Sequence, residues 1–383
     1  MTLHSLTQRL PGLLPLMVLA AACAGPVEDQ NKDDQTESAD LSDVGMMRLS
    51  YVDAARSSWR APGEARPINA WVWYPAAAPS LAQAFQVPEE KPVFDGGFAA
   101  RDAVPESGAH PLIVMSHGTG GSAFQMMWLG RRLADAGYVA VAVDHHGNSA
   151  AEDAFDPRGF FYIWERPRDL SVLIDRVLAD PALANVVDPS RIGAAGFSLG
   201  GYTVVATAGG RIDLENFRAF CASDEADPTC APQTEYPDAS KDLDALIAEN
   251  PDAAPDDAAR RASYRDERIT AVAAFAPALG RMFAEESLAA IETTLKLIVG
   301  DADAVAPAKT NARHIAGRAP GADLTVYPGV GHYAFLNACT DHGRRFVAPC
   351  KDGPGVDRAE VHDRAAGEAI AFFNDAFSST EPR

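Results

Sequence analysis

Residues 196–201 read GFSLGG and follow directly on the apolar run RIGAA of residues 191–195. An apolar run of this kind predicts a buried strand, and the residues after it have a helical pattern. Ser198 is therefore expected on a tight turn from a strand into a helix, where only glycine leaves room for the backbone. This arrangement is typical of a nucleophilic serine, and a glycine-rich turn without chemistry is the alternative.

Apolar segments of strand length alternate along the chain with segments of helical length. The expected strands cover residues 68–74, 112–115, 138–143, 192–197, 269–275, 295–299 and 324–327. The expected helices cover residues 124–136, 167–179, 198–208, 307–317 and 359–377. Because the central strands are apolar throughout, they predict a mostly parallel sheet with helices on both faces, an α/β fold. Residues 71–74, WVWY, are expected in antiparallel edge strands.

Two long segments interrupt this alternation. Residues 76–110 are rich in Pro, Gly and Ala and are expected to form an excursion before the first central strand. Residues 211–268 follow the helix after Ser198 and carry many acidic side chains and five prolines. A segment of that length inside a compact domain is usually functional or mobile. We interpret residues 211–268 as a cap over the active site, with a disordered surface excursion as the alternative.

Acyl transfer also needs donors for the negative charge that develops on the attacked carbonyl oxygen. If a helix begins after Ser198, the backbone N–H of Leu199 points toward that charge. A second donor is expected from a loop after an earlier strand, where residues 116–121 read SHGTGG. The N–H of Thr119 is the candidate, and a flexible glycine turn needed for close packing is the alternative.

A base and an acid that orients it complete such a site. The stretch LIVGDAD runs off an expected strand and places Asp301 and Asp303 at the same sheet edge as Ser198. Either carboxylate can serve, the other then capping a helix or anchoring a loop, and we prefer Asp303. The stretch VYPGVGH is another strand exit and ends in His332. A loop histidine is usually polar surface, but this one completes the order Ser, Asp, His.

Taken together, these motifs resemble the α/β-hydrolase superfamily. More narrowly, the chain from about residue 48 to its end is similar to the bacterial proteins called predicted dienelactone hydrolases, which are related to platelet-activating-factor acetylhydrolases. The superfamily resemblance is carried by GFSLGG, SHGTGG, GDADAVAP and GVGHYAF. The narrower one is carried by VWYPA, SHGTGGS, DHHGNS, ERPRDLS, GFSLGGYT, GHYAFLNAC and the insert that contains Cys221 and Cys230. The resemblance implies an α/β-hydrolase fold, and its G-x-x-D pattern maps the acid onto Asp303. Dienelactone hydrolases proper use a cysteine nucleophile, so Ser198 argues against dienelactone as the substrate.

The resemblance implies a serine hydrolase that cleaves carboxylic esters through an acyl-enzyme intermediate. His332, oriented by Asp303, would take the proton of Ser198. Two alternatives stay open: a lipase or phospholipid acyl hydrolase, and a non-catalytic binding lipoprotein on a hydrolase scaffold. The acidic cap favours small or medium soluble esters over lipids, and the presence of every triad member argues against a binding protein.

The first residues have the profile of a secretory signal, with an arginine before a short apolar stretch that ends in VLAAAC. Residues 1–22 are interpreted as a lipoprotein signal peptide and Cys23 as the lipidated mature N-terminus, with ordinary cleavage and secretion as the alternative. Residues 23–45 are acidic and polar and are expected to be a disordered tether, so that the hydrolase domain covers residues 46–383. The protein is thus expected to be exported, as a membrane-anchored lipoprotein in the periplasm or at the cell surface, or else secreted.

Four cysteines remain besides Cys23: Cys221, Cys230, Cys339 and Cys350. An even number in an exported chain predicts two disulfides, and three pairings are possible. We favour the pairing of the first with the second and of the third with the fourth, because each then closes a short loop. A zinc site is the rival interpretation, but the spacings contain no CxxC pair.

A formal net charge of −20 argues against nucleic acid as a partner and against adhesion to anionic lipid surfaces. A small-molecule ester is the expected partner, contact with a membrane is expected only through a lipid anchor, and the oligomeric state is not predicted. Neither a cofactor nor a metal ion is expected, although His145, His146 and nearby His117 are a candidate metal cluster.

Other side chains have two interpretations each. Trp128 and Trp164 line an acyl pocket or belong to the core, and the core is the commoner place for such residues. Arg166 and Asp169, three residues apart on an expected helix, clamp a loop or form an exposed pair, and we prefer the exposed pair.

Overall fold

The protein is seen here in a computed structural model that describes residues 41–378. The expected signal peptide, Cys23 and the expected tether up to residue 40 lie outside these residues. Residues 41–45, expected as the end of the tether, instead begin the first strand of the structure. Within the described range, no helix has the length and apolar character that crossing a membrane requires.

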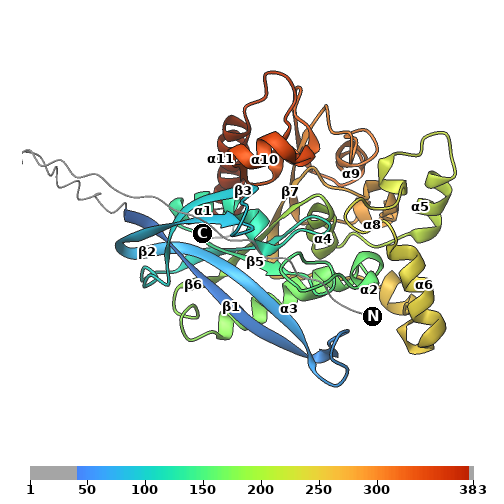
Figure 1. The fold of residues 1–383 in the computed structure, drawn as a ribbon, viewed down its shortest axis with the longest axis horizontal. Coiled ribbons are helices and arrows are strands. Elements are labelled where there is room, and N and C mark those ends of the chain that lie inside the picture. The colour runs from blue at the N-terminus through green and yellow to red at the C-terminus, as the bar shows by residue number, and fades with distance from the viewer. Residues whose placement is uncertain (1–40, 379–383) are drawn as a thin grey trace, which may run out of the picture. The chain divides into compact units, whose positions relative to one another are not determined.

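Six parallel strands form one side of a ten-stranded sheet, from its interior to the edge at the last of them (Figure 1). In spatial order they are β5 (Val139–Asp144), β4 (His110–Ser116), β6 (Val187–Phe197), β7 (Ile269–Phe275), β8 (Thr294–Gly300) and β9 (Asp323–Tyr327). Each contains or nearly matches an expected strand. Strands β5 and β7 are buried along almost their whole length, and β6 is buried from Ile192 to Phe197, which explains the continuous apolar sequence of these stretches.

Helices cover both faces of the sheet, because alternate strand residues point to opposite sides. On one face, Ile113 and Met115 pack with α1 (Met127–Asp135) and α11 (Arg358–Ser378). On the other face, Leu112 and Val114 pack with α3 (Glu165–Ala179) and α4 (Leu199–Thr207), and two short helices, α8 (Glu285–Ala289) and α9 (Ala312–Ala316), also belong to this core. The predicted α/β architecture is therefore confirmed.

The N-terminal strands extend the sheet beyond β5. Strand β1 (Leu41–Ser57) pairs antiparallel with β2 (Ala65–Val87), and β2 in turn pairs antiparallel with β5. Strand β3 (Phe94–Arg101) adds to β2, and the two-residue β10 (Ala338–Cys339) lies at the outer edge.

The expectation of an excursion over residues 76–110 is partly wrong, because β2 continues to Val87 and β3 follows it. Many side chains in this part of β2 are exposed or only half-buried, so the stretch lacks the apolar pattern by which a strand is recognised. The helix expected over residues 307–317 is shorter in the structure, since the chain before α9 forms turns.

The segment of residues 211–268 is built from short helices. The remaining helices of the chain are α2 (Pro157–Phe161), α5 (Leu214–Cys221), α6 (Ala239–Glu249), α7 (Asp257–Arg261) and α10 (Asp341–Phe346). Of these, α5, α6 and α7 lie in the segment, and the first two stand out to one side of the sheet in Figure 1.

Both short-loop disulfides are present, Cys221–Cys230 in this segment and Cys339–Cys350 near the C-terminal helix. The favoured pairing is therefore the one that the structure contains.

Candidate active site

Ser198 stands between β6 and α4 with φ 55° and ψ −116°, a strained conformation for a residue with a side chain. Its own N–H donates to the Phe275 carbonyl of β7, and its carbonyl accepts from Ala278 N–H, each at 3.0 Å. These bonds fix the backbone on both sides of the strained residue. The hydroxyl is thereby presented at the carboxyl end of the sheet.

Glycine is required on both sides of Ser198 because the backbone segments approach so closely. A Cβ on Gly196 would lie 2.1 Å from the Gly200 carbonyl oxygen, and a Cβ on Gly200 would lie 2.0 Å from the Ser116 carbonyl oxygen. Real Cβ contacts are never this short. The glycines of the motif therefore allow α4 to pack against the ends of β4 and β6.

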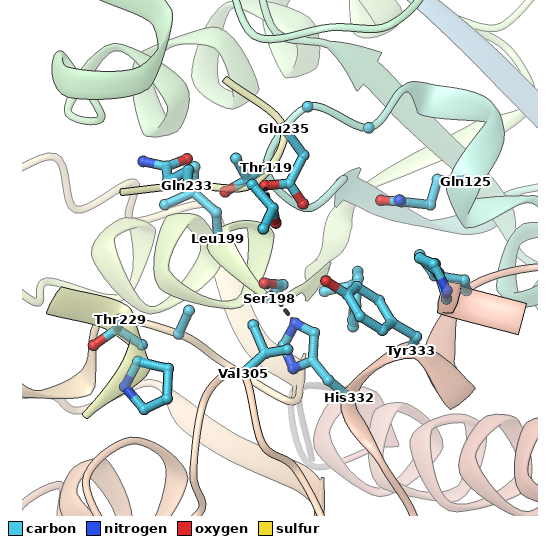
Figure 2. A pocket seen from close by; sticks show the side chains of 18 of the residues that line it. Thr119, Gln125, Ser198, Leu199, Thr229, Gln233, Glu235, Val305, His332 and Tyr333 are labelled. Carbon is cyan, nitrogen blue, oxygen red and sulfur yellow. Dashed lines mark hydrogen bonds between the residues drawn. The ribbon is translucent and has the colours of Figure 1, made fainter. Parts of the chain in front are cut away.

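The three residues selected from the sequence come together at one edge of the sheet. His332 Nε2 lies 2.9 Å from Ser198 Oγ, and His332 Nδ1 lies 2.7 Å from Asp303 Oδ2 (Figure 2 shows the first of these bonds). All three side chains are buried, with residue exposures of 4–8%. In this geometry, the imidazole can accept the serine proton at Nε2 while the carboxylate accepts from Nδ1.

Asp303 and Asp301 have different surroundings. The second oxygen of Asp303, Oδ1, accepts from the N–H groups of Val305 and Ala306 at 2.9 and 2.7 Å, so the carboxylate is fixed in place. Asp301 is exposed and accepts instead from Gly329 N–H at 2.7 Å. Only Asp303 contacts the imidazole, and Asp301 anchors a loop.

Two backbone N–H groups beside Ser198 have no acceptor among the described residues. In the loop after β4, Gly118 N–H donates to Gln125 Oε1 and Gly120 N–H donates to Asn148 Oδ1, both at 2.9 Å, but Thr119 N–H between them has no partner. Leu199 is the first residue of α4, so its N–H has no partner within the helix. Both residues line the cavity that contains Ser198.

This cavity has a volume of about 440 Å³. Phe197, Ala278 and Leu279 form part of an apolar wall. Gln233 and Glu235 lie across the cavity from His332 (Figure 2). Glu235 is the only acidic residue of the lining, and its side chain packs directly against Gly120. Burial, and then the charge of Glu235, raise the pKa of the Tyr333 phenol.

A buried polar network lies behind the Thr119 loop, and the expectation that Arg166 and Asp169 form an exposed pair is wrong. Arg166 is 2% exposed and Asp169 is fully buried. Asp169 accepts from Arg66 and from His145 Nδ1, the latter at 3.0 Å. Burial alone would raise the pKa of the Asp169 carboxyl, but Arg66 and Arg56 hold it well below its usual range.

The other candidate residues, His145, Trp128 and Trp164, lie in the protein core and have structural contacts there. His145 Nε2 lies 2.9 Å from Ser116 Oγ, and burial lowers the pKa of this imidazole to about 3, so His145 is neutral at ordinary pH. No group of three or more potential ligands that could hold a metal ion occurs within residues 41–378. Trp128 packs edge-on against Phe275, Trp164 stacks on Tyr162, and neither tryptophan lines the cavity.

Three residues of the site were not selected from the sequence: Gln125, Asn148 and Glu235. The amides of Gln125 and Asn148 shape the Thr119 loop, and Glu235 faces the cavity. Asn148 stands in the motif DHHGNS, which was noted for its histidines. Nothing in the sequence marks Gln125 or Glu235, because their roles depend on which segments meet in space.

The glycine requirement can be tested with two alanine substitutions. Gly200→Ala places a methyl group against the Ser116 carbonyl, so we expect it to lower the melting temperature or prevent folding. Gly367→Ala, at an exposed position of helix α11 with nothing within 4 Å of the added Cβ, should stabilise the protein by roughly 0.5–1 kcal/mol. Thermal unfolding followed by circular dichroism measures both, and equal effects of the two substitutions would contradict the close approach.

Comparison with known proteins gives matches at the level of family and fold. Residues 113–348 match the model of the family described as "Alpha/beta hydrolase family". Two relatives, Cutinase est2 and Cutinase est1 of Thermobifida alba, are each 30% identical over 112 residues, which are 29% of this chain and 34% of either relative. The match thus spans about a third of the cutinases' length.

A solved structure agrees over most of the chain. The ferulic acid esterase from Streptomyces cinnamoneus superimposes with a TM-score of 0.59 at 20% identity, covering 88% of this chain and 91% of that one. At this identity the likeness concerns the fold. The family match, by contrast, covers more than half of the chain, from β4 through the segment that contains His332. The protein therefore belongs to the α/β-hydrolase family.

Proposed function

We propose that the protein is a serine hydrolase that cleaves carboxylic esters. The observation that carries this proposal is the continuous line of hydrogen bonds from Ser198 Oγ through His332 to Asp303, which opens into a cavity of about 440 Å³. Thr119 and Leu199 line the same cavity, and their N–H groups, which have no acceptor among the described residues, suit a developing oxyanion. A nucleophile, a base, an acid and an anion site therefore occur together.

In the proposed mechanism, Ser198 Oγ attacks the ester carbonyl carbon while His332 Nε2 takes its proton. The carbonyl oxygen becomes an oxyanion that accepts hydrogen bonds from the backbone of Thr119 and Leu199. When the intermediate collapses, the imidazolium gives the proton to the departing alkoxide, and the acyl group stays on Ser198. Water then attacks the acyl-enzyme, with His332 acting as the base again, and the acid product and free serine are released.

The comparisons support ester hydrolysis as the reaction class, because the similar proteins are called cutinases and a ferulic acid esterase. The finer relation to predicted dienelactone hydrolases and platelet-activating-factor acetylhydrolases remains our proposal from the motifs. Gln233, Thr234 and Glu235 line the cavity with polar side chains, which favours small or medium soluble esters over long acyl chains. For the same reason we rank a lipase-type activity second.

A fluorophosphonate probe tests the nucleophile directly. We expect the probe to label the wild-type protein on Ser198 and to leave Ser198→Ala unlabelled, and we expect hydrolysis of p-nitrophenyl butyrate by that variant to fall on the order of 10⁶-fold in kcat. Ser190→Ala removes an exposed serine near the start of β6, at the opposite end of the strand from Ser198, and should be labelled like wild type. If the folded wild-type protein is not labelled, a binding protein on a hydrolase scaffold becomes the better interpretation.

Glu235 should make the cavity unfavourable for anionic esters. No cation pairs with this carboxylate among the described residues, so its charge, together with the net charge of −20, acts on whatever enters. At low ionic strength, we expect mono-p-nitrophenyl glutarate to be hydrolysed with a lower kcat/KM than neutral p-nitrophenyl valerate. Glu235→Gln should reduce the ratio of kcat/KM for the neutral ester to kcat/KM for the anionic ester by about fivefold.

The matched control for that experiment is Glu249→Gln. Glu249 is exposed at the end of α6 in the same segment and does not line the cavity, so its removal changes the net charge equally without changing the local charge. Equal rates for the two esters at low salt would refute the electrostatic argument. If both substitutions reduce the difference in kcat/KM between the two esters equally, the effect comes from the net charge of the whole surface rather than from Glu235.

We also propose that the hydrolase works outside the cytoplasm, anchored through a lipid on Cys23 and tethered by the residues between Cys23 and β1. Two disulfides and the signal-like N-terminal sequence support export. We further propose that residues 211–268 act as the cap of the domain formed by residues 46–383. Mass spectrometry of the mature N-terminus should find a lipidated Cys23, whereas an unmodified N-terminus at a neighbouring residue would mean simple secretion.

A further inference from the structure

Arg166, the second residue of α3, lies directly behind the loop that carries Thr119. Its guanidinium donates four hydrogen bonds to groups around the turn that carries Ser198. Nη2 donates to the His117 carbonyl oxygen and to Ser116 Oγ, Nη1 donates to Asn148 Oδ1 at 3.1 Å, and Nε donates to Thr203 Oγ1 at 3.0 Å. One planar side chain therefore connects three separate segments of the chain.

The first connection reaches the Thr119 loop from both sides. The His117 carbonyl lies two residues before Thr119, and Arg166 holds it directly. On the other side, Asn148 Oδ1 accepts from both Arg166 and Gly120 N–H, the latter at 2.9 Å. Because the residues before and after Thr119 are fixed in this way, the direction of the Thr119 N–H is fixed as well.

The second connection reaches α4. Thr203 Oγ1 accepts from Arg166 and donates to the Leu199 carbonyl at 2.9 Å. Leu199 is the first residue of this helix and supplies the other N–H of the proposed oxyanion site. The same guanidinium thus contacts both structural units from which the two proposed donors come.

Stability alone does not explain a cation at this place. Arg166 is 2% exposed, and none of the ion pairs within residues 41–378 includes it, because Asp169 is bonded to Arg66 and Arg56 instead. Burial lowers the pKa of Arg166 to about 9, against the opposing effect of Asp169, so the side chain is still charged at neutral pH. Buried charges are often replaceable by apolar residues without loss of stability, which makes a role in geometry the better explanation.

We propose that Arg166 is a positioning residue that sets the spacing between the Thr119 and Leu199 N–H groups in the oxyanion site. The inference rests on the proposed function of this site. A guanidinium suits the task because its donors stand in a rigid planar fork, whereas the ammonium of lysine is a single point with freely rotating donors. Arg166→Lys therefore keeps the charge and removes the geometry.

The experiment compares Arg166→Lys with wild type on p-nitrophenyl butyrate. The oxyanion forms only along the reaction path, so we expect kcat to fall about 10- to 100-fold while KM changes by less than about twofold. A second readout is the affinity for an aryl trifluoromethyl ketone, whose adduct with Ser198 places an oxyanion in the site. That affinity should fall in parallel with kcat, while binding of the corresponding trifluoromethyl carbinol, which forms no adduct, should not change.

Arg56→Lys is the matched control. The Arg56 side chain is also buried and contacts Asp169 at Oδ1, whereas His145 contacts Oδ2. Its other ion pairs are with Asp53 and Glu165, and it has no bond to Ser116, His117 or Asn148 among the described residues. We expect this variant to lose thermal stability while its kcat remains within about twofold of wild type. If Arg56→Lys and Arg166→Lys lower kcat equally, the network has a general structural role and the proposal is overturned.

Thr203 gives a second test if Arg166→Lys does not fold. Thr203→Val keeps the shape but removes the acceptor of the guanidinium Nε, whereas Thr203→Ser retains it. We expect the valine variant to lose kcat and ketone affinity together and the serine variant to keep both. Unchanged kcat in the valine variant contradicts the proposal. Absence of activity and of fluorophosphonate labelling in wild type would instead refute the proposed function.

Discussion

The site depends on how closely the start of α4 approaches the ends of β4 and β7. Gly200 lies against the Ser116 carbonyl and Gly201 lies against Pro277, at distances where any side chain would collide with backbone. This approach places the helix N-terminus, with its unpaired N–H groups, beside the loop that follows β4. It also forces Ser198 into a positive φ, so the strain at the serine and the presence of an anion site are two results of one packing arrangement.

The order of the strands explains how distant residues meet. Ser198, Asp303 and His332 each follow a parallel strand, namely β6, β8 and β9, and parallel strands present their carboxyl ends at one edge. The loops after β8 and β9 then have little freedom. A Cβ on Gly300 would lie 1.8 Å from the Val330 carbonyl oxygen, so the two loops touch, and this contact brings the Asp303 and His332 segments together.

Much of the fold could be predicted from the sequence, since strands buried on both faces are apolar throughout and β7 has the expected limits. Strand β3 could not, because its pairing with β2 is long-range and its sequence, FDGGFAAR, lacks a clear alternation. Within the site, the side chains that touch Ser198 stand in recognisable motifs. Arg166 was placed wrongly because helical spacing to Asp169 suggests a local pair, whereas both side chains point inward to partners more than fifteen residues away.

The two disulfides link the chemistry of the cavity to the compartment in which the chain folds. Cys230 adjoins the cavity-lining residues 228–235, and Asp227 ties the same stretch to Thr310 and Asn311 ahead of α9. Cys350 adjoins Pro349, which also lines the cavity. Both bonds therefore hold cavity-lining segments that have few other regular contacts. Disulfides form and persist in oxidising compartments outside the cytoplasm. A cavity whose walls are held by two disulfides therefore fits the proposal that the chain is exported.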